Sequence, residues 1–477
     1  MLTLRSELAE WRLYGAEVAL AYRLDNEVRE VSYRELVNDI FALERKLRLD
    51  PEQRVAIIGE NSVLWFCYFY ACLLAGKQTL ICDMLLPINE MATVLQSMGI
   101  EKVYLSPSLQ GLDAEIEENV STCRTAFFED GFQENSGSDA DTGVAQDSTT
   151  EEGEILCLTS GTTGKAKGVM IGMPAFVNNN VCLSGSICGG KGDVVYSPLP
   201  MHHMYGVNKT FAFLHLGARI CLGSMRSVEK DIQVFGPNRL LIVPTVVEFL
   251  DKRNRLDCGI ESIIVSGCKC EKKVESICER HGIFLQNIYG SSESAGGMAL
   301  NVKGDAIDEL TVIPGRDIRI ADDGEILVET KWLMDGYYQD KSATERKMSG
   351  NVLYTEDMGY FDDEGRLHIN GRKKDMIAME NGDKIYCEET DEILSSLAGV
   401  KEAAVIYVKQ KLIAVVCAQA GATEEQIRES IAQYNHGQQV IRRISDVWIR
   451  KNSLPRTVTG KMKRAELTEA YCRKFDV

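Results

Sequence analysis

Several features that would place this chain in a specialised class are missing from its sequence. It has only 10 prolines in 477 residues and no low-complexity composition, which excludes collagen-like and mostly disordered chains. It has no internal repeat of about 20 to 50 residues, which excludes solenoids and propellers. Its longest apolar run, residues 65–76, is shorter than the roughly 20 residues of a membrane-spanning helix. We therefore expect a globular protein without a membrane span.

Basic residues are in the minority, and the cysteines lack the spacing of a metal site. The chain has 53 Lys and Arg against 70 Asp and Glu, a net charge of -17 that does not favour nucleic acid or an anionic membrane as a partner. Its 15 cysteines include no CxxC pair, so a zinc site is not indicated. We interpret them as reduced thiols. Together with the absence of an apolar signal core near the start, this predicts a cytoplasmic protein.

The pattern of apolar residues predicts an α/β fold. RVAIIGE is typical of a buried strand, residues 65–76 of a buried helix, and the alternation continues through QTLICD, EKVYLS and TAFFED. This predicts a large N-terminal domain, residues 1–371, with mostly parallel sheets and flanking helices. Residues 134–153 are polar and acidic, which indicates a surface loop. After 371 the pattern predicts a compact, mobile α+β lid domain, residues 372–477.

The most informative run is LTSGTTGKAKGVM at 158–170. It follows a predicted strand, and its glycines, hydroxyls and lysines offer backbone N–H groups, O–H donors and positive charge to a polyphosphate. Only two residues separate its first two glycines, so the run is not a Walker A loop. Taken alone, it is equally compatible with a flexible turn.

This run resembles the phosphate loop of the adenylate-forming superfamily, which includes acyl- and aryl-CoA ligases, peptide-synthetase adenylation domains and luciferase. Further segments resemble the superfamily in the same order, and they are PLPMHHMYG at 198–206, YGSSESAG at 289–296, GEILVETKWLMDGYYQD at 324–340, YTEDMGYFDDEGRLHINGRKKDMI at 354–377 and LPRTVTGKMKRAEL at 454–467. Among its members, the motifs are most similar to acyl-CoA ligases. Collinear matches of this kind are hard to obtain by chance.

The resemblance implies an ATP site, a magnesium ligand and catalytic side chains. Lys461 would bridge the acyl carboxylate and the α-phosphate, Glu293 would bind Mg²⁺, and His203 would guard the entrance of the acyl pocket. The residues implied to contact ATP are Thr159, Ser160, Gly161, Thr162, Thr163, Gly164, Lys165, Tyr289, Gly290, Ser292, Asp357, Arg372 and Lys461. Tyr289 would lie against adenine, and Asp357 and Arg372 would contact the ribose.

The chain also departs from the superfamily pattern at a few positions. Ser292 stands where a threonine is usual, and Glu356 stands where glycine is more frequent. Lys374 falls at the hinge between the two domains, so the resemblance implies a lid that turns between two half-reactions. Ala378 and Cys387 replace a frequent lysine and proline, which bears on the second half-reaction.

The resemblance implies that the enzyme activates a carboxylic acid as acyl-AMP, releases pyrophosphate and transfers the acyl group to a thiol. The segment after His203 contains Lys209 but no acidic residue, so an α-amino acid is not expected and the pocket should be apolar. Coenzyme A is the expected acceptor, with Lys373, Arg442 and Arg443 as candidate phosphate contacts. The alternative is a stand-alone enzyme that loads the phosphopantetheine of an acyl carrier protein.

Overall fold

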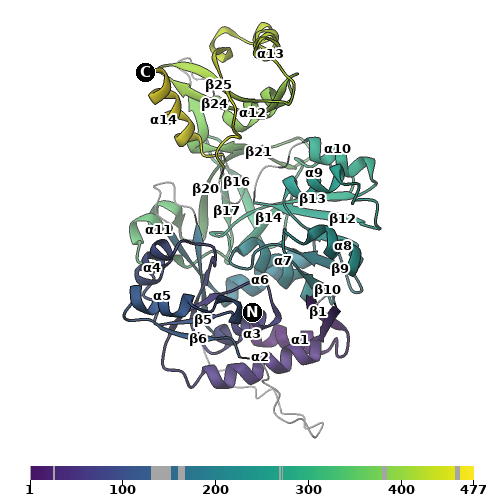
Figure 1. Ribbon diagram of the computed structural model, residues 1–477, viewed down its shortest axis with the longest axis vertical. Coiled ribbons are helices and arrows are strands. Elements are labelled where there is room, and N and C mark those ends of the chain that lie inside the picture. Colours follow the sequence, from purple (N-terminus) through teal and green to yellow (C-terminus); the bar gives the residue numbers. More distant parts are fainter. Residues whose placement is uncertain are drawn as a thin grey trace. The chain divides into compact units, whose positions relative to one another are not determined.

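The computed structural model describes residues 2–24, 27–129, 152–159, 167–267, 270, 272–378, 384–456 and 462–476. Its contacts divide the chain into two compact units (Figure 1). Unit 1 comprises Met1–Asp317 and Val328–Leu353, and unit 2 comprises Ile318–Leu327 and Tyr354–Val477. This division assigns part of the chain before residue 371 to the second unit. The predicted domains 1–371 and 372–477, with a hinge near Lys374, stay a prediction.

A seven-stranded sheet of unit 1 has the order β18-β8-β7-β4-β3-β5-β6. The strands from β7 to β6 are parallel, and β8 and β18 are antiparallel at one edge. Parallel neighbours need a crossover, and α3 (Val63–Leu74), the predicted buried helix, connects β3 to β4. The strands are β3 (Arg54–Ile58), β4 (Gln78–Cys82), β5 (Lys102–Leu105), β6 (Arg124–Phe127), β7 (Glu154–Thr159), β8 (Lys167–Gly172) and β18 (Gly336–Tyr337).

A nine-stranded sheet of unit 1 has the order β15-β14-β13-β12-β11-β9-β10-β1-β2. The strands from β13 to β1 are parallel, and antiparallel strands form both edges. The strands are β1 (Val18–Leu24), β2 (Glu27–Ser32), β9 (Val194–Ser197), β10 (Arg219–Leu222), β11 (Arg239–Leu241), β12 (Ser262–Ser266), β13 (Phe284–Ser291), β14 (Gly296–Leu300) and β15 (Thr311–Val312).

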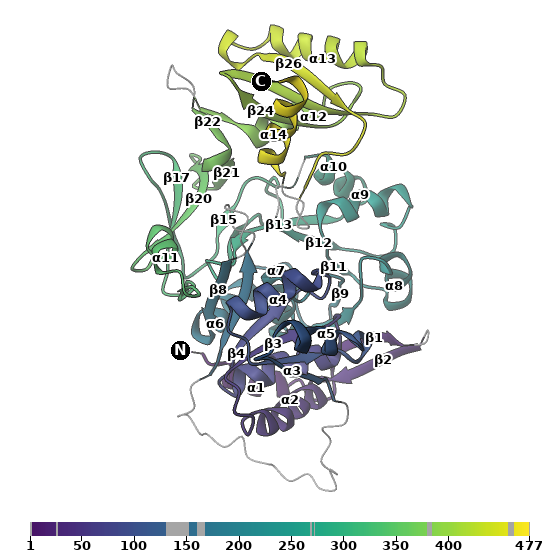
Figure 2. The ribbon, with the colours of Figure 1, turned by 60° about the vertical axis from the view of Figure 1, so that its left-hand side comes forward.

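The helices of unit 1 follow from local sequence signals and from burial. A capping box of Ser32 and Glu35 begins α2, whereas α3 is apolar on all sides and almost wholly buried. Helices α1, α2 and α3 pack side by side (Figure 2). The helices are α1 (Leu4–Arg12), α2 (Tyr33–Leu47), α3, α4 (Ile88–Ser97), η1 (Pro107–Leu109), α5 (Leu112–Asn119), α6 (Met173–Ser184), α7 (Met204–His215), α8 (Val228–Phe235), α9 (Pro244–Lys252), α10 (Lys272–Arg280) and α11 (Lys341–Lys347).

One hydrophobic core of unit 1 joins side chains of both large sheets with those of α3, α6 and α7. Cys67 and Cys72 of α3 lie buried in this core and form no disulfide. Among the helices that the structure describes, none is both long and apolar enough to cross a membrane.

Unit 2 contains paired strands followed by a small α+β region. A five-stranded sheet has the order β16-β17-β20-β19, with β21 paired to β20, and its short strand β19 belongs to the residues of unit 1. A three-stranded sheet, β24-β25-β26, packs against α12, α13 and α14, as the sequence predicts. The elements are β16 (Asp317–Ile320), β17 (Glu325–Glu329), β19 (Met348–Ser349), β20 (Val352–Phe361), β21 (Leu367–Arg372), η2 (Lys373–Asp375), β22 (Met376–Ala378), β23 (Lys384–Tyr386), α12 (Cys387–Ser395), β24 (Val400–Val408), β25 (Lys411–Ala418), α13 (Glu424–His436), η3 (Val440–Arg442), β26 (Ile444–Arg450) and α14 (Arg464–Phe475).

Candidate active site

Strands β7 and β8 lead into and out of the predicted phosphate loop. They pair antiparallel as far as Thr159 and Lys167, which are opposite each other in register. The remaining residues predicted to form this loop lie outside the described residues, and they are Ser160, Gly161, Thr162, Thr163, Gly164 and Lys165. Their contacts with phosphate therefore stay predictions, and the described strands define where the loop starts and ends.

The β13–β14 turn carries the residues predicted to contact adenine, phosphate and metal. Tyr289 and Gly290 lie at the end of β13, and Ser292 and Glu293 follow in the turn. A Cβ atom at Gly290 would lie 2.4 Å from the carbonyl oxygen of Gly296 on the neighbouring strand. Only glycine therefore allows the two backbones to approach this closely. Gly290 is thus required for the close approach of the two strands, in addition to its predicted contact with the nucleotide.

The Glu293 carboxylate is held by the edge strand next to the phosphate loop. The Tyr337 hydroxyl on β18 donates a hydrogen bond to Glu293 Oε1 at 2.9 Å. Lys167 Nζ lies 4.9 Å from the centre of the same tyrosine ring, within the range of a cation–π contact. The Met334 N–H also donates to the Glu293 carbonyl at 3.0 Å. One tyrosine therefore links the end of the phosphate loop to the predicted metal ligand.

Glu293 has the chemistry of the predicted magnesium ligand. Mg²⁺ prefers oxygen donors and is usually held by one or two carboxylates together with substrate phosphates and water. Within the described part of the chain, no cluster of three or more His, Cys, Asp or Glu side chains could hold a metal by itself. A single carboxylate beside a phosphate loop fits a metal that is shared with a nucleotide.

Ser292 lies against β7, the strand that leads into the phosphate loop. Burial raises the pKa of the Cys157 thiol to about 12, and a hydrogen bond with Ser292 partly opposes this rise. Ser292 therefore connects the β13–β14 turn with β7, and Glu293 connects it, through Tyr337, with β18, the strand that pairs with β8.

His202 and His203 lie directly before α7, with ring centres 4.3 Å apart. Among the described residues, the Nε2 atoms of both rings find no hydrogen-bond partner. Burial, assisted by the charge of His203, lowers the pKa of His202 to about 4, although Asp83 opposes this shift. Burial also lowers the pKa of His203. Both imidazoles are therefore neutral near pH 7, and the predicted role of His203 at the acyl entrance stays a prediction.

Asp357 and Arg372, the residues predicted to contact the ribose, face each other in unit 2. They are register partners on β20 and β21, and Arg372 Nε lies 2.9 Å from Asp357 Oδ1. Arg372 Nη1 also donates to the Thr355 carbonyl at 3.4 Å. The structure thus brings these two predicted residues together.

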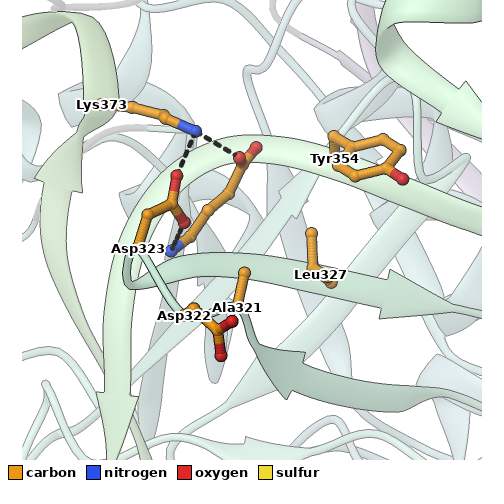
Figure 3. A pocket seen from close by; sticks show the side chains of 7 residues that line it. Ala321, Asp322, Asp323, Leu327, Tyr354 and Lys373 are labelled. Carbon is orange, nitrogen blue, oxygen red and sulfur yellow. Dashed lines mark hydrogen bonds and ion pairs between the residues drawn. The ribbon is translucent and has the colours of Figure 1, made fainter.

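A pocket of about 490 Å³ in unit 2 is lined by Lys373 and by the loop between β16 and β17 (Figure 3). Lys373 Nζ lies 2.6 Å from Asp323 Oδ2 and 2.8 Å from Glu325 Oε2. Hydrogen bonds with these two carboxylates raise the pKa of Lys373. Because two carboxylates already pair with its ammonium group, Lys373 is a poor candidate for a phosphate contact of coenzyme A.

The predicted catalytic Lys461 lies outside the described residues. Residues 457–460 also lie outside the described residues, and Arg456 and Met462, which enclose this stretch, form an antiparallel β-bridge. Lys374, the predicted hinge residue, lies exposed in η2. The roles of Lys461 and Lys374 stay predictions.

Sequence reasoning missed the side chains that position the predicted ones. Tyr337 was visible only as part of the GYYQD motif, and its partner Glu293 is distant in the sequence. The carboxylates around Lys373 were likewise visible only as turn residues of a DDGE segment. In both cases the tertiary pairing of strands supplies the contact.

Comparisons with known proteins identify the family and the fold. The profile of the AMP-binding enzyme family matches residues 9–338. A 2-succinylbenzoate–CoA ligase of Listeria monocytogenes is 25% identical over 481 residues, which cover 96% of this chain and 98% of that protein.

Two solved structures share the fold. The anthranilate CoA ligase AuaEII in complex with anthranoyl-AMP has a TM-score of 0.84 at 19% identity, covering 100% of this chain and 98% of that chain. The o-succinylbenzoate coenzyme A synthetase of Bacillus subtilis in complex with ATP and magnesium ion has a TM-score of 0.79 at 21% identity. The match covers 97% of this chain and 99% of that chain. These matches confirm the predicted fold class. Because the family profile covers more than half of the sequence, the chain belongs to the AMP-binding enzyme family and is an AMP-forming acid–thiol ligase.

Proposed function

We propose that this ligase activates an aryl or fatty carboxylic acid with Mg²⁺-ATP and transfers the acyl group to the thiol of coenzyme A. The acid would first form acyl-AMP with release of pyrophosphate, and the thiol would then displace AMP. The similar ligases named above act on aryl acids, which supports the aryl class. The alternative acceptor is the phosphopantetheine of a carrier protein. The described cysteines form no disulfide, which supports a cytoplasmic location for either reaction.

The observation that carries this proposal is the position of Glu293 beside the strands that flank the phosphate loop. Its carboxylate is held by Tyr337, whose ring also contacts Lys167. Mg²⁺ bound there would neutralise phosphate charge while acyl-AMP forms. The Glu293 side chain would hold this charge in place, and Tyr337 would keep the carboxylate oriented.

Lys461, Asp357 and Arg372 would serve the first half-reaction. Bringing a carboxylate to the α-phosphate sets like charges together, at a cost of about 4 kcal/mol at about 4 Å and an effective dielectric near 20. A cation between them, the proposed role of Lys461, offsets this repulsion in the transition state. The ion pair of Arg372 with Asp357 would hold that carboxylate ready for the ribose hydroxyls.

His203 would stand where acid and thiol enter. Its imidazole is neutral near pH 7, because burial lowers its pKa. A neutral ring with an Nε2 atom that has no hydrogen-bond partner among the described residues can approach an anionic carboxylate or a thiol at little electrostatic cost. We therefore assign it a positioning role at the entrance.

Pyrophosphate release across a panel of fatty, aryl and α-amino acids tests the proposed function. We expect release with aryl or fatty acids, formation of the coenzyme A thioester when coenzyme A is added, and no release above background with α-amino acids. Consumption of acyl-AMP by a phosphopantetheinylated carrier protein, but not by coenzyme A, would establish the alternative acceptor. Release with an α-amino acid alone, or with no acid at all, would refute the proposal.

A further inference from the structure

Lys209 is a buried lysine without a charged or hydrogen-bonding partner. It lies on α7 and is 2% exposed. Its Nζ lies 5.6 Å from the centre of the Tyr205 ring, one helical turn earlier, and among the described residues it makes no hydrogen bond or ion pair. Leaving a buried donor unpaired is unfavourable, so such a group in a folded protein requires an explanation.

The charged neighbour that acts on Lys209 is a second cation. Burial, with a smaller contribution from the Arg316 guanidinium, lowers the pKa of Lys209 to about 7. Arg316 donates from Nη1 to the Pro314 carbonyl at 3.0 Å and from Nη2 to Asn179 Oδ1 at 2.7 Å. Both oxygen acceptors are neutral, the Cys182 thiol also interacts with the guanidinium, and within the described structure Arg316 has no carboxylate partner. The Arg316 charge therefore acts on Lys209, and among the described residues neither side chain has a carboxylate partner.

Lys209 lies in the segment after His203 that is predicted to line an apolar acyl pocket, so its buried amine departs from that prediction. Tyr205 and Lys209 share one face of α7, because residues four apart lie above one another on a helix. The Tyr205 hydroxyl donates to the Ile264 carbonyl at 2.8 Å, which directs this face toward the middle of β12. Helix α7 also packs against α6, which carries Asn179, and against β14, which follows the Glu293 turn (Figure 1).

We propose that Lys209, supported by Arg316, binds a second carboxylate on the acid substrate, so that the enzyme prefers dicarboxylic acids. This inference rests on the proposed function and names its substrate class. The phosphates of ATP are assigned to the β7–β8 loop and to the Glu293 turn, so the anion that remains is on the acid. An α-amino acid would instead bring an ammonium group to two cations, which opposes its binding.

A bound carboxylate would also restore the charge of the lysine. An anion within hydrogen-bond distance favours the ammonium form and raises a depressed lysine pKa. The substrate would thereby gain a charge-assisted hydrogen bond in a buried site, where water does not compete. A monocarboxylic acid with a methyl group at the same place would leave the amine unpaired.

Matched pairs of acids test this preference. We would measure pyrophosphate release for straight-chain dicarboxylic acids and benzene dicarboxylates, each beside the monoacid in which a methyl group replaces the second carboxylate. For the best pair we expect the diacid to have the higher kcat/KM, by on the order of 10- to 100-fold, the range of one charge-assisted hydrogen bond. Equal or higher kcat/KM for every monoacid would refute the inference while leaving the proposed function in place.

Lys209→Met removes the cation and keeps the shape and apolar stem of the side chain. We expect the variant to lose the diacid preference through a higher KM for the diacid, and to gain kcat/KM for the monoacid. Lys191→Met, at an exposed lysine, is the matched control and should keep the preference of the parent enzyme.

Thermal unfolding without substrate separates this role from a structural one. Replacing an unpaired buried amine by an apolar group should raise the melting temperature. A lower melting temperature of Lys209→Met with an unchanged diacid preference would show that Lys209 stabilises the fold and does not bind the second carboxylate of the substrate.

Discussion

At the scale of single residues, the predicted metal ligand depends on a hydrogen bond that sequence motifs do not reveal. Glu293 accepts from Tyr337, and the adjacent Tyr338 has different contacts, because Gln339 donates to its hydroxyl. Two neighbouring tyrosines thus differ in whether they touch the candidate site. This difference offers a matched test of what orients Glu293.

Tyr337→Phe should weaken the response of the enzyme to magnesium. Losing an outer partner of a metal ligand typically costs about 10- to 100-fold in metal affinity. We therefore expect half-maximal pyrophosphate release to require about tenfold more Mg²⁺, measured by titration at saturating ATP. Tyr338→Phe is the control and should leave the titration unchanged. An unchanged titration for Tyr337→Phe would show that the hydrogen bond does not orient the carboxylate.

At the scale of elements, strand β20 contains a backbone conformation that favours glycine at a position where this chain has glutamate. Glu356 has φ of 62°, in the left-handed region that favours glycine. The superfamily more often has glycine at this position. The Glu356 N–H donates to Glu325 Oε1 at 2.8 Å, and the same carboxylate accepts from Lys373 through Oε2. The strained residue therefore belongs to the network that holds the pocket of Figure 3 together.

Substitutions at Glu356 should follow the conformation of the backbone. Glu356→Gly keeps the N–H donor and relieves a cost of about 1 to 2 kcal/mol, so after the entropy of glycine we expect stability to be unchanged or about 1 kcal/mol higher. Glu356→Val should destabilise, since a β-branched residue fits this region poorly. Urea unfolding of each variant measures both effects.

The control for Glu356 is an exposed glutamate in an ordinary strand. At Glu30 of β2 the relative stability of the two variants should be reversed, so that valine is tolerated and glycine destabilises the protein. If glycine destabilised both positions equally, the positive φ would not limit stability at Glu356.

At the scale of the whole molecule, the chain consists of two units, and the predicted site residues are divided between them. Glu293, Ser292 and Lys167 belong to unit 1, whereas Asp357 and Arg372 belong to unit 2. Lys461 also falls in the second unit by its position in the chain. The proposed two-step reaction would draw on residues of both units, and the turn of the lid between the two steps stays a prediction.

Two variants should separate the half-reactions. Lys461→Ala should lower acyl-AMP formation by about 10²-fold or more, because a preorganised cation is lost, yet should transfer the acyl group from supplied acyl-AMP to the thiol at close to the normal rate. Lys374→Pro should spare acyl-AMP formation and block transfer, because the proline ring fixes φ at the hinge. Single-turnover measurements of each step, with Lys374→Ala as the control that keeps backbone freedom, check both expectations.

A different result would argue against a lid with two positions. If Lys461→Ala slowed acyl transfer from supplied acyl-AMP as much as it slows acyl-AMP formation, this lysine would act in both steps. A normal rate of acyl transfer to the thiol by Lys374→Pro would show that the lid does not rotate about this residue.

The sequence by itself determined the α/β fold class, the superfamily and the order of the functional segments. Strand and helix periods are local properties, so alternation such as RVAIIGE followed by the apolar run at 65–76 predicts β3 and α3 directly. Glycine, hydroxyl and charged residues in a short loop after a strand are also local, so the run at 158–170 and the turn around Glu293 could be found without a structure.

The tertiary structure decided which side chains meet and which charges are buried. Tyr337 reaches Glu293 because β18 pairs with β8, a strand far from it in the sequence. Lys209 could have been a solvated lysine, and only the packing of α7 against the sheets buries it beside Arg316. Burial and long-range pairing depend on how elements assemble, so no local pattern encodes them, and the substrate preference inferred here depends on both.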